Sequence, residues 1–256
     1  MISTSRGIYK LIGLALGCSM MMATPSYAAT ISWTDWSNPV LAVGSTAGSA
    51  DGTLDGGITV KFTGDVFTTT QVGAGTDTDY WSGFPLAYTS SVVGNAPPPS
   101  DVIALIGGGD RVLTQTLTLS GPSGWSVENP VMAILSLGQS LASNGVNVPV
   151  DYDFGSTSFT ILSQGVGSFG ASDSSLTGNA TATTGTILKG LEGHGVIQFS
   201  GTFDSSNSTL TWTVPNPENW HGFTLGKVAV PEPASLILLG AGLAAIGIWR
   251  RKVAKV

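Results

Sequence analysis

The stretch RVLTQTLTLS (111–120) alternates apolar and hydroxyl side chains with a period of two. Its leucines share one face with Gln115, while its threonines take the other face. Successive side chains of a β-strand point to opposite faces, so this period predicts a strand that is buried on one side. STLTWTV (208–214) and ITVKF (58–62) repeat the pattern, and all three therefore predict strands of a sheet with one apolar face.

Further strands are expected in runs rich in valine, isoleucine, phenylalanine and tryptophan, which favour strands. Clusters of turn-forming residues separate them: SADGTLDGG (49–57), NAPPPSD (95–101), IGGGD (106–110) and SDSSLTGN (172–179). About nine or ten short strands at this spacing predict an all-β fold: a single antiparallel β-sandwich domain, jelly-roll-like, over residues 29–229. The additional strand candidates are 31–36, 101–106, 129–138, 156–163, 195–203 and 222–230.

The charge pattern excludes some partners. Charged residues make up 10% of the 256 residues, and between Thr30 and Ala229 there are 15 acidic and four basic residues, a net charge of −11. Such a body is repelled by nucleic acid and by anionic lipid head groups, so we expect no nucleic-acid partner. Cys18 is the only cysteine of the chain, so disulfides do not stabilise the predicted domain.

The first 28 residues have the organisation of a secretory signal peptide. A basic start precedes the apolar core 11–22, and small residues follow, which predicts export through the Sec translocon and cleavage after Ala28, or alternatively after Ala29. A second interpretation is a lipoprotein signal acylated at Cys18, although the leucine typical of such a motif is missing. A buried helix of a folded domain is a third.

The chain ends with VPEPASLILLGAGLAAIGIWRRKVAKV (230–256). Two prolines prevent a helix from extending backwards into the domain. The sixteen residues of 234–249 carry no charge and would form a helix about 24 Å long, slightly short of the ~30 Å hydrocarbon core. The basic residues after it favour a membrane helix with a cytoplasmic C-terminus, and a buried core helix is the alternative.

This tail resembles the PEP-CTERM sorting signal of Gram-negative bacteria, over about a tenth of the chain. The resemblance implies recognition by exosortase, a membrane enzyme, and a host that makes extracellular polysaccharide. It also implies inner-membrane anchoring before processing and a final place at the cell surface or in the extracellular matrix. Carried over residue by residue, the sorting motif is Pro231, Glu232 and Pro233, the membrane anchor runs from Ala234 to Trp249 and includes Leu236, Leu239, Leu243 and Ile246, and the basic stop is Arg250, Arg251 and Lys252.

The body contains no recognisable catalytic motif for a serine hydrolase, a P-loop nucleotide site or a zinc protease. Glu192 and His194 would share a face of a strand, but no serine or cysteine at recognisable spacing completes a catalytic set, and flanking glycines indicate a turn. His221, with only Glu218 nearby, is expected to be a hydrogen-bonded histidine at a strand start. We therefore expect no catalytic residue and no enzyme.

Three acid pairs combine carboxylates with turn-forming residues, namely Asp51 with Asp55, Asp77 with Asp79, and Asp151 with Asp153. Calcium binds six to eight oxygen ligands, which such loops can supply, but aspartate is also an ordinary turn residue. Aromatic residues suggest sugar stacking instead, or core packing. The candidate ligand or calcium loop is Asp77, Asp79, Tyr80 and Trp81; Trp33, Trp36 and Trp220 are further stacking candidates, and Trp212 is expected in the core.

Three functions fit these features. The first is a structural, non-catalytic protein of the cell surface or matrix, sorted by its tail. The second is a carbohydrate-binding module for secreted polysaccharide, with or without calcium. The third is a secreted glycan hydrolase, which would need two carboxylates about 5–10 Å apart.

Overall fold

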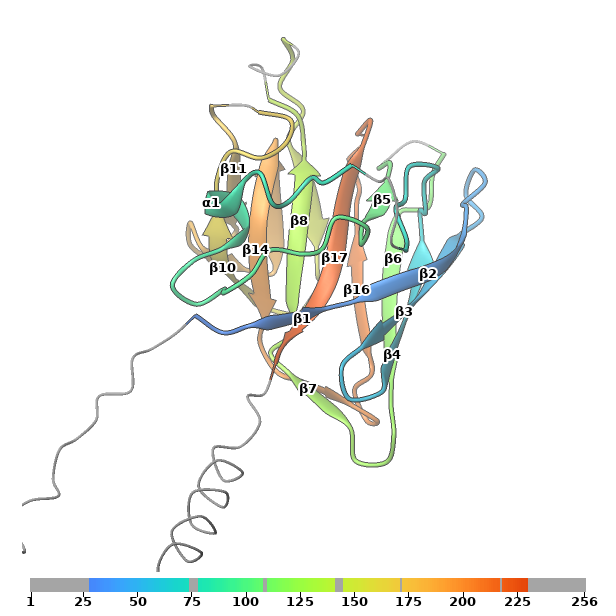
Figure 1. Cartoon of the computed structure of the whole chain (residues 1–256). Helices are drawn as coiled ribbons and strands as arrows, with labels where there is room; N and C mark the ends of the chain where they lie inside the picture. Colours follow the sequence, from blue (N-terminus) through green and yellow to red (C-terminus); the bar gives the residue numbers. More distant parts are fainter. Residues whose placement is uncertain are drawn as a thin grey trace, which may run out of the picture.

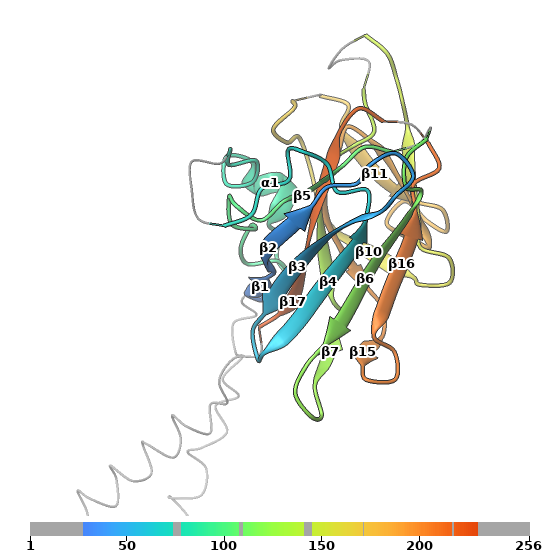
Figure 2. The ribbon, with the colours of Figure 1, turned by 90° about the vertical axis from the view of Figure 1, so that its right-hand side faces the viewer.

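The computed structural model describes residues 28–73, 78–107, 110–140, 145–170, 172–216 and 218–229. The fold is all-β with antiparallel sheets, as predicted, and its one helix in the described part is the single turn α1 (Pro85–Tyr88). Figures 1 and 2 show two twisted sheets that face each other. The finer assignment to a jelly roll stays a prediction.

A seven-stranded sheet has the order β1-β17-β8-β14-β10-β12, with β5 also paired to β17. Its strands are β1 (Ile31–Trp33), β5 (Ile103–Leu105), β8 (Val131–Leu137), β10 (Phe159–Gln164), β12 (Thr184–Gly185), β14 (Gly193–Phe199) and β17 (His221–Val228).

An eight-stranded sheet has the order β11-β13-β9-β16-β6-β4-β3-β2, and β7 pairs with β15 in a separate ribbon. The strands are β2 (Asp35–Val40), β3 (Gly48–Leu54), β4 (Ile58–Gly64), β6 (Thr114–Ser120), β9 (Val150–Asp153), β11 (Ser175–Gly178), β13 (Ile187–Leu191) and β16 (Thr209–Thr213), with β7 (Ser126–Glu128) and β15 (Thr202–Asp204) in the ribbon.

The three strands predicted from period-two alternation form neighbours in the eight-stranded sheet. β16 pairs with β6, which pairs with β4, and Leu210 lies opposite Leu117. Buried and more exposed residues alternate along each of them. Leu113 is an exception, because β6 begins at the next residue and this leucine is 43% exposed.

Two sequence interpretations are wrong. The described residues contain seventeen strands, not nine or ten. The segment 49–57 was expected to be a turn, but most of it lies in β3, which pairs with β4 along its whole length. Ala50 and Leu54 are buried there, so pairing and burial override the low strand propensity of aspartate and glycine.

The main core lies between the two sheets. Phe223 of the seven-stranded sheet packs edge-on against Phe62 and Trp212 of the other, with ring centroids 5.1 and 5.2 Å apart. All three rings are buried. Burying an aromatic side chain contributes on the order of 2–3 kcal/mol, so this cluster stabilises the facing of the sheets.

The outer face of the seven-stranded sheet is covered as well. Val131, Ala133 and Leu135 point away from the main core and pack in a second cluster with Trp81 and Tyr88 of the segment around α1. In Figure 1 this segment crosses in front of β8 and β14. Strand β8 is therefore buried on both faces, which explains why it lacks the alternation of the half-buried strands.

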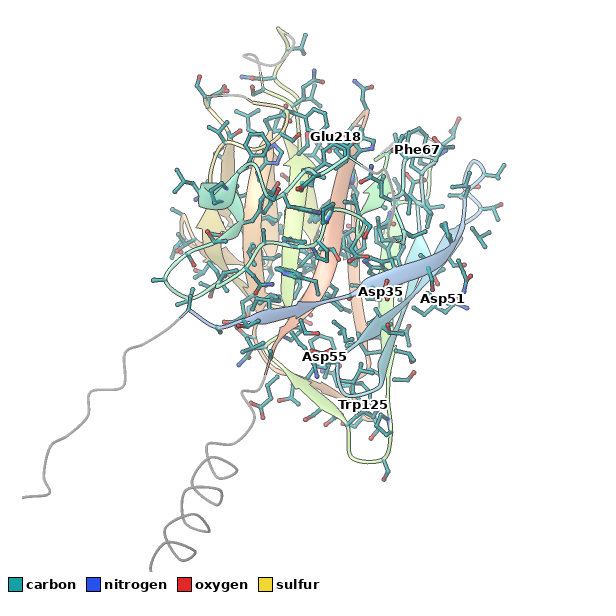
Figure 3. The ribbon with its side chains drawn as sticks, viewed as in Figure 1. Asp35, Asp51, Asp55, Phe67, Trp125 and Glu218 are labelled. Atoms are coloured by element: carbon teal, nitrogen blue, oxygen red, sulfur yellow. The ribbon has the colours of Figure 1, made fainter. Side chains whose placement is uncertain are left out.

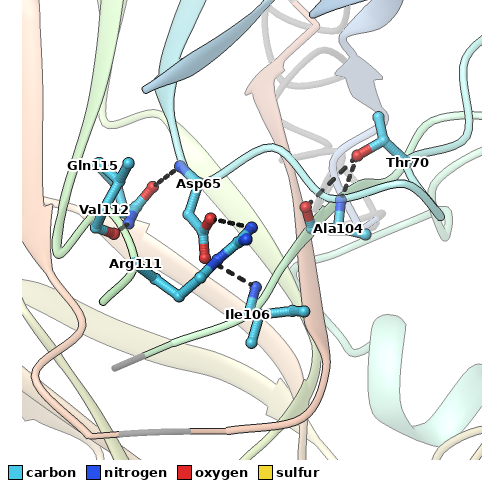
Figure 4. A network of polar contacts seen from close by, with 7 residues as sticks. All are labelled: Asp65, Thr70, Ala104, Ile106, Arg111, Val112 and Gln115. Carbon is cyan, nitrogen blue, oxygen red and sulfur yellow. Dashed lines mark hydrogen bonds and ion pairs between the residues drawn. The ribbon is translucent and has the colours of Figure 1, made fainter. Parts of the chain in front are cut away.

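A buried ion pair anchors the loop after β4. Asp65 is fully buried, and its Oδ1 lies 2.5 Å from Arg111 Nη2. The Ile106 amide donates to its Oδ2 at 3.2 Å, and its own amide donates to Gln115 Oε1 at 2.8 Å (Figure 4). This network explains the one polar residue on the apolar face of β6, because Gln115 also donates to Val112 O at 2.7 Å.

Both predicted targeting segments lie outside the described residues. The signal peptide and the helix 234–249 therefore stay predictions at the structural level. Among the helices that the structure describes, none is long and apolar enough to span a bilayer.

Candidate functional site

A pocket of about 470 Å³ lies at the end of the sandwich where β17 begins. Its walls come from the end of β8, the β13–β14 junction, the loop before β17 and three surface loops. Glu218, on the loop before β17, is labelled near the upper end of the molecule in Figure 3. The pocket volume falls within the range of small-molecule sites, about 300–1,000 Å³.

Unusual backbone geometry occurs at two pocket residues. Ser136 and Glu192 have φ of 56° and 48°, and the only other described non-glycine residues with positive φ are two asparagines. Glu192 joins β13 of one sheet to β14 of the other, and the β8–β14 register shifts beside it. This irregularity lets the Glu192 side chain line the pocket. Such conformations cost about 1–3 kcal/mol each and cluster at functional sites.

Glu192 belongs to a buried polar network on the pocket floor. Ser136 Oγ donates to Glu192 Oε1 at 2.5 Å, and the Ser136 amide donates to His194 Nδ1 at 3.2 Å. Tyr88 Oη lies 2.8 Å from the same Nδ1. Since Nδ1 accepts these bonds, the ring proton of neutral His194 is on Nε2, which lies 3.8 Å from Glu192 Oε1.

Burial lowers the pKa of His194 to about 4, so the imidazole is neutral at physiological pH. The 3.8 Å contact with Glu192 is therefore not an ion pair. His194 Nε2 is buried without a hydrogen-bond partner among the described residues. The floor thus combines a carboxylate with an uncharged imidazole.

Glu218 supplies the second carboxylate. Its Oε2 lies 2.7 Å from His221 Nδ1, and the Gly138 amide also hydrogen-bonds the carboxylate. Burial raises the pKa of Glu218, the contacts with His221 and Gly138 oppose that rise, and the charge of Glu192 adds to it. Both carboxylates line the same pocket, so a cation bound there would be attracted by each of them in its ionised form.

Three aromatic side chains form one wall. The Tyr80 ring lies 5.8 Å from Phe169 and 5.4 Å from Trp220, and Phe169 lies 5.1 Å from Trp220. Trp220 Nε1 donates to Thr69 Oγ1 at 2.6 Å, which fixes the indole. Phe169 is 44% exposed, so part of this wall can contact a ligand.

The predicted ligand loop is divided by the fold. Tyr80 lines the pocket, whereas Trp81 is fully buried and packs edge-on against Tyr88 at 4.8 Å. Asp79 caps the loop: its Oδ1 accepts from the Trp81 and Ser82 amides at 2.9 and 3.0 Å. Partial burial alone would raise the pKa of Asp79, but these bonds and the Ser82 hydroxyl lower it. Asp77 lies outside the described residues.

The other candidates lie apart from the pocket, except Trp220. Trp33, Trp36 and Trp212 are buried, the last in the core as expected. His221 is the first residue of β17, in agreement with the sequence interpretation. No cluster of three or more metal-ligating side chains occurs in the described part of the chain. Of the remaining acids, Asp51 lies on β3, Asp55 in the turn after it, and Asp151 and Asp153 on β9.

Glu192 and His194 stand out as a pair in the sequence, where they are expected to lie in a turn and to have no catalytic role. The sequence patterns did not point to Ser136 or Phe169, and Glu218 stood out only as a neighbour of His221. These residues come from distant segments, so no local spacing links them. The one local signal was the polar serine in the apolar run 131–137, which marks the irregular end of β8.

The arrangement differs from a serine hydrolase. Ser136 Oγ donates to a carboxylate, and no imidazole is placed to take its proton. The pocket instead offers carboxylate acceptors beside an aromatic wall.

Comparison with known proteins identifies the tail. A family model described as the PEP-CTERM protein-sorting motif matches residues 229–252. This match confirms the resemblance seen at residues 231–233, and it indicates an exported protein that exosortase, a membrane protein, sorts through this signal. No curated protein and no solved structure matches the chain at a significant level.

Proposed function

We propose that the chain is a cell-surface or matrix protein, sorted through its C-terminal motif, whose β-sandwich body binds a saccharide unit of extracellular polysaccharide without catalysing a reaction. The sorting motif at 229–252 supports export. The observation that carries the binding function is one pocket that three aromatic side chains and two buried carboxylates line together.

These groups match the two kinds of surface of a sugar ring. The C–H face of a pyranose is apolar and packs on aromatic rings, here Tyr80, Phe169 and Trp220. Its hydroxyls donate hydrogen bonds, and Glu192 and Glu218 offer carboxylate oxygens.

The position of the pocket suits a surface-anchored binder. The pocket lies at the start of β17, and the sorting motif follows the end of the same strand at Val228. Eight residues of strand span about 26 Å. A body held at the membrane by residues 234–249 before processing would therefore present the pocket away from the bilayer.

Binding without turnover is the part of the proposal that the titration below tests directly. Glu192 accepts a bond from Ser136, and Glu218 is held by His221 and Gly138. Each carboxylate keeps further lone pairs with which it can accept from a sugar hydroxyl. A glycosidase would use one of the two as a proton donor and the other to attack or to activate water, so the titration includes a search for turnover.

The test is calorimetric titration of the full chain, in detergent, with the polysaccharide of its host and with defined oligosaccharides, in calcium and in EDTA. We expect binding in both media, because Asp79 is already occupied by amide donors. Phe169→Ala should weaken binding about tenfold, since an aromatic contact contributes about 1–1.5 kcal/mol.

The matched control is Val43→Ala, an exposed apolar residue of the β2–β3 loop that does not line the pocket. It should leave the affinity unchanged. Absence of binding to any saccharide would reject the proposal and leave a purely structural role. Release of reducing ends during the titration would show that the protein is a hydrolase.

A further inference from the structure

The charges in the pocket have one sign. Glu192 and Glu218 are buried, and no lysine or arginine lines the pocket in the described part of the chain. The body has only four basic residues between Thr30 and Ala229, and the charge of one of them, Arg111, is already balanced by Asp65. Ser136 and the Gly138 amide satisfy hydrogen bonds without neutralising a charge, whereas His221 adds a Coulombic attraction to Glu218.

Within the described part of the chain, His194 Nε2–H lacks an acceptor, which a hydroxyl or ring oxygen of the sugar, and not its ammonium group, would supply. Its side chain is fully buried, and Nε2 has no hydrogen-bond partner among the described residues although it lies 3.8 Å from Glu192 Oε1. A buried polar atom without a partner costs about 1–3 kcal/mol, and such atoms call for an explanation. The ring lies under the wall, stacked with Phe169 at 6.5 Å.

The aromatic wall favours a cation as well. The faces of tyrosine, phenylalanine and tryptophan attract ammonium groups electrostatically, by about 0.5–2 kcal/mol each. Tyr80, Phe169 and Trp220 adjoin the carboxylates in one pocket. The net charge of −11 on the body adds a long-range field that attracts cationic sugars and repels uronic acids.

We propose that the pocket selects a saccharide unit with a free, protonated amino group, that is, a non-acetylated amino sugar, whose ammonium group lies between Glu192 and Glu218 while its ring packs on the aromatic wall. This inference rests on the proposed saccharide-binding function and specifies its ligand. An acetylated amino sugar would lack the charge, and its acetyl group would occupy the space of the ammonium hydrogen bonds.

The experiment compares three ligands of equal length on the full chain in detergent: an oligomer of glucosamine, the same oligomer fully N-acetylated, and the matching glucose oligomer. Titrations run at about pH 6, where a primary amine is protonated. We expect the free-amine oligomer to bind at least tenfold more tightly than the other two.

Two isosteric variants separate the pocket from general charge. Glu192→Gln keeps an acceptor for Ser136 but removes the charge, and it should reduce the preference for the free amine to threefold or less. Asp51→Asn removes one exposed charge on β3 and should leave the preference unchanged.

Each outcome supports or overturns the amine inference. Equal or tighter binding of the acetylated or glucose oligomer would overturn the amine inference and leave saccharide binding intact, whereas no binding of any oligomer would overturn both. An equal loss of preference in both variants would show unspecific charge attraction and also overturn the inference. If Glu192→Gln does not fold, as judged by circular dichroism, the ligand series on the unchanged chain decides alone.

Discussion

At the scale of single residues, the pocket is built from positions that are unfavourable in isolation. Ser136 and Glu192 adopt positive φ, and Glu218 and His194 are buried polar groups. Each costs free energy that the surrounding sheets must offset. This concentration of costs at one place is the main physical reason to assign a function to it.

The buried imidazole makes stability depend on pH. Burial lowers the pKa of His194 from 6.5 to about 4, so the folded state binds its proton less tightly than the unfolded state. Its contribution to stability is complete above pH 6.5 and is lost as pH falls toward 4. Between about pH 7 and 4.5, the loss should reach about 2 kcal/mol.

The measurement is urea unfolding of the unchanged chain and of His194→Gln at both pH values. The unchanged chain should lose about 2 kcal/mol more than the variant over this interval. Burial raises the pKa of Glu218 and, to about 6, that of Asp101, so these groups favour the folded state on acidification. Both occur in both proteins and cancel in the difference. Equal losses would show that His194 does not titrate as proposed.

At the scale of strands, the sequence predicts elements that are half-buried. β6 and β16 follow from strict alternation because each has one face on the core and one in solvent. β3 does not, because the sequence GSADGTL (48–54) has the composition of a turn, and only its pairing with β4 and β2 makes it a strand. Such pairings join segments that no local pattern connects.

The same limit applies to the pocket. The pair Glu192 and His194 was visible, since spacing of two places residues on one face of a strand. That Ser136, Phe169 and Glu218 join them depends on how β8, the β10–β11 loop and the β16–β17 loop meet at one end of the sandwich. Alternation along one strand does not indicate which loops lie next to each other at the end of the sandwich.

The β10–β11 loop can hold its position only because residue 167 is a glycine, which has no Cβ. Gly167 lies against the His194 ring so closely that a Cβ there would be 2.2 Å from Cγ of the imidazole. The rigid ring is held by Tyr88 and Ser136 and cannot give way. In Gly167→Ala the loop must therefore lift, and Phe169 would leave the aromatic wall.

We expect Gly167→Ala to weaken saccharide binding about tenfold, comparable to loss of the Phe169 ring itself. The matched control is Gly83→Ala, because a Cβ at Gly83 meets nothing within 4 Å and the backbone there has no positive φ. Titration of both variants with the same oligosaccharide measures the effect. Unchanged affinity in Gly167→Ala would show that the loop does not position the wall.

At the scale of the whole molecule, the two ends of the domain formed by residues 29–229 are bonded to each other. The last backbone hydrogen bond runs from the Ala229 amide to Thr30 O at 2.8 Å, so the two ends of the body are joined beside β1 and β17. Both apolar clusters share the seven-stranded sheet, since β8 contributes to each of them. Because of this sharing, neither cluster can lose its packing without disturbing the other.

A chain shortened to residues 29–229 should therefore fold without the tail, unfold in one transition and keep the pocket, which lies at the other end of β17. Trp36 and Trp212 report on the main core and Trp81 on the second cluster, so fluorescence and far-UV circular dichroism should give the same urea midpoint. Dithiothreitol should not shift that midpoint, because the shortened chain contains no cysteine. Saccharide affinity should stay within twofold of the full chain. Two separate transitions would show that the covering segment around α1 unfolds independently, and a loss of affinity would show that the tail contributes to the site.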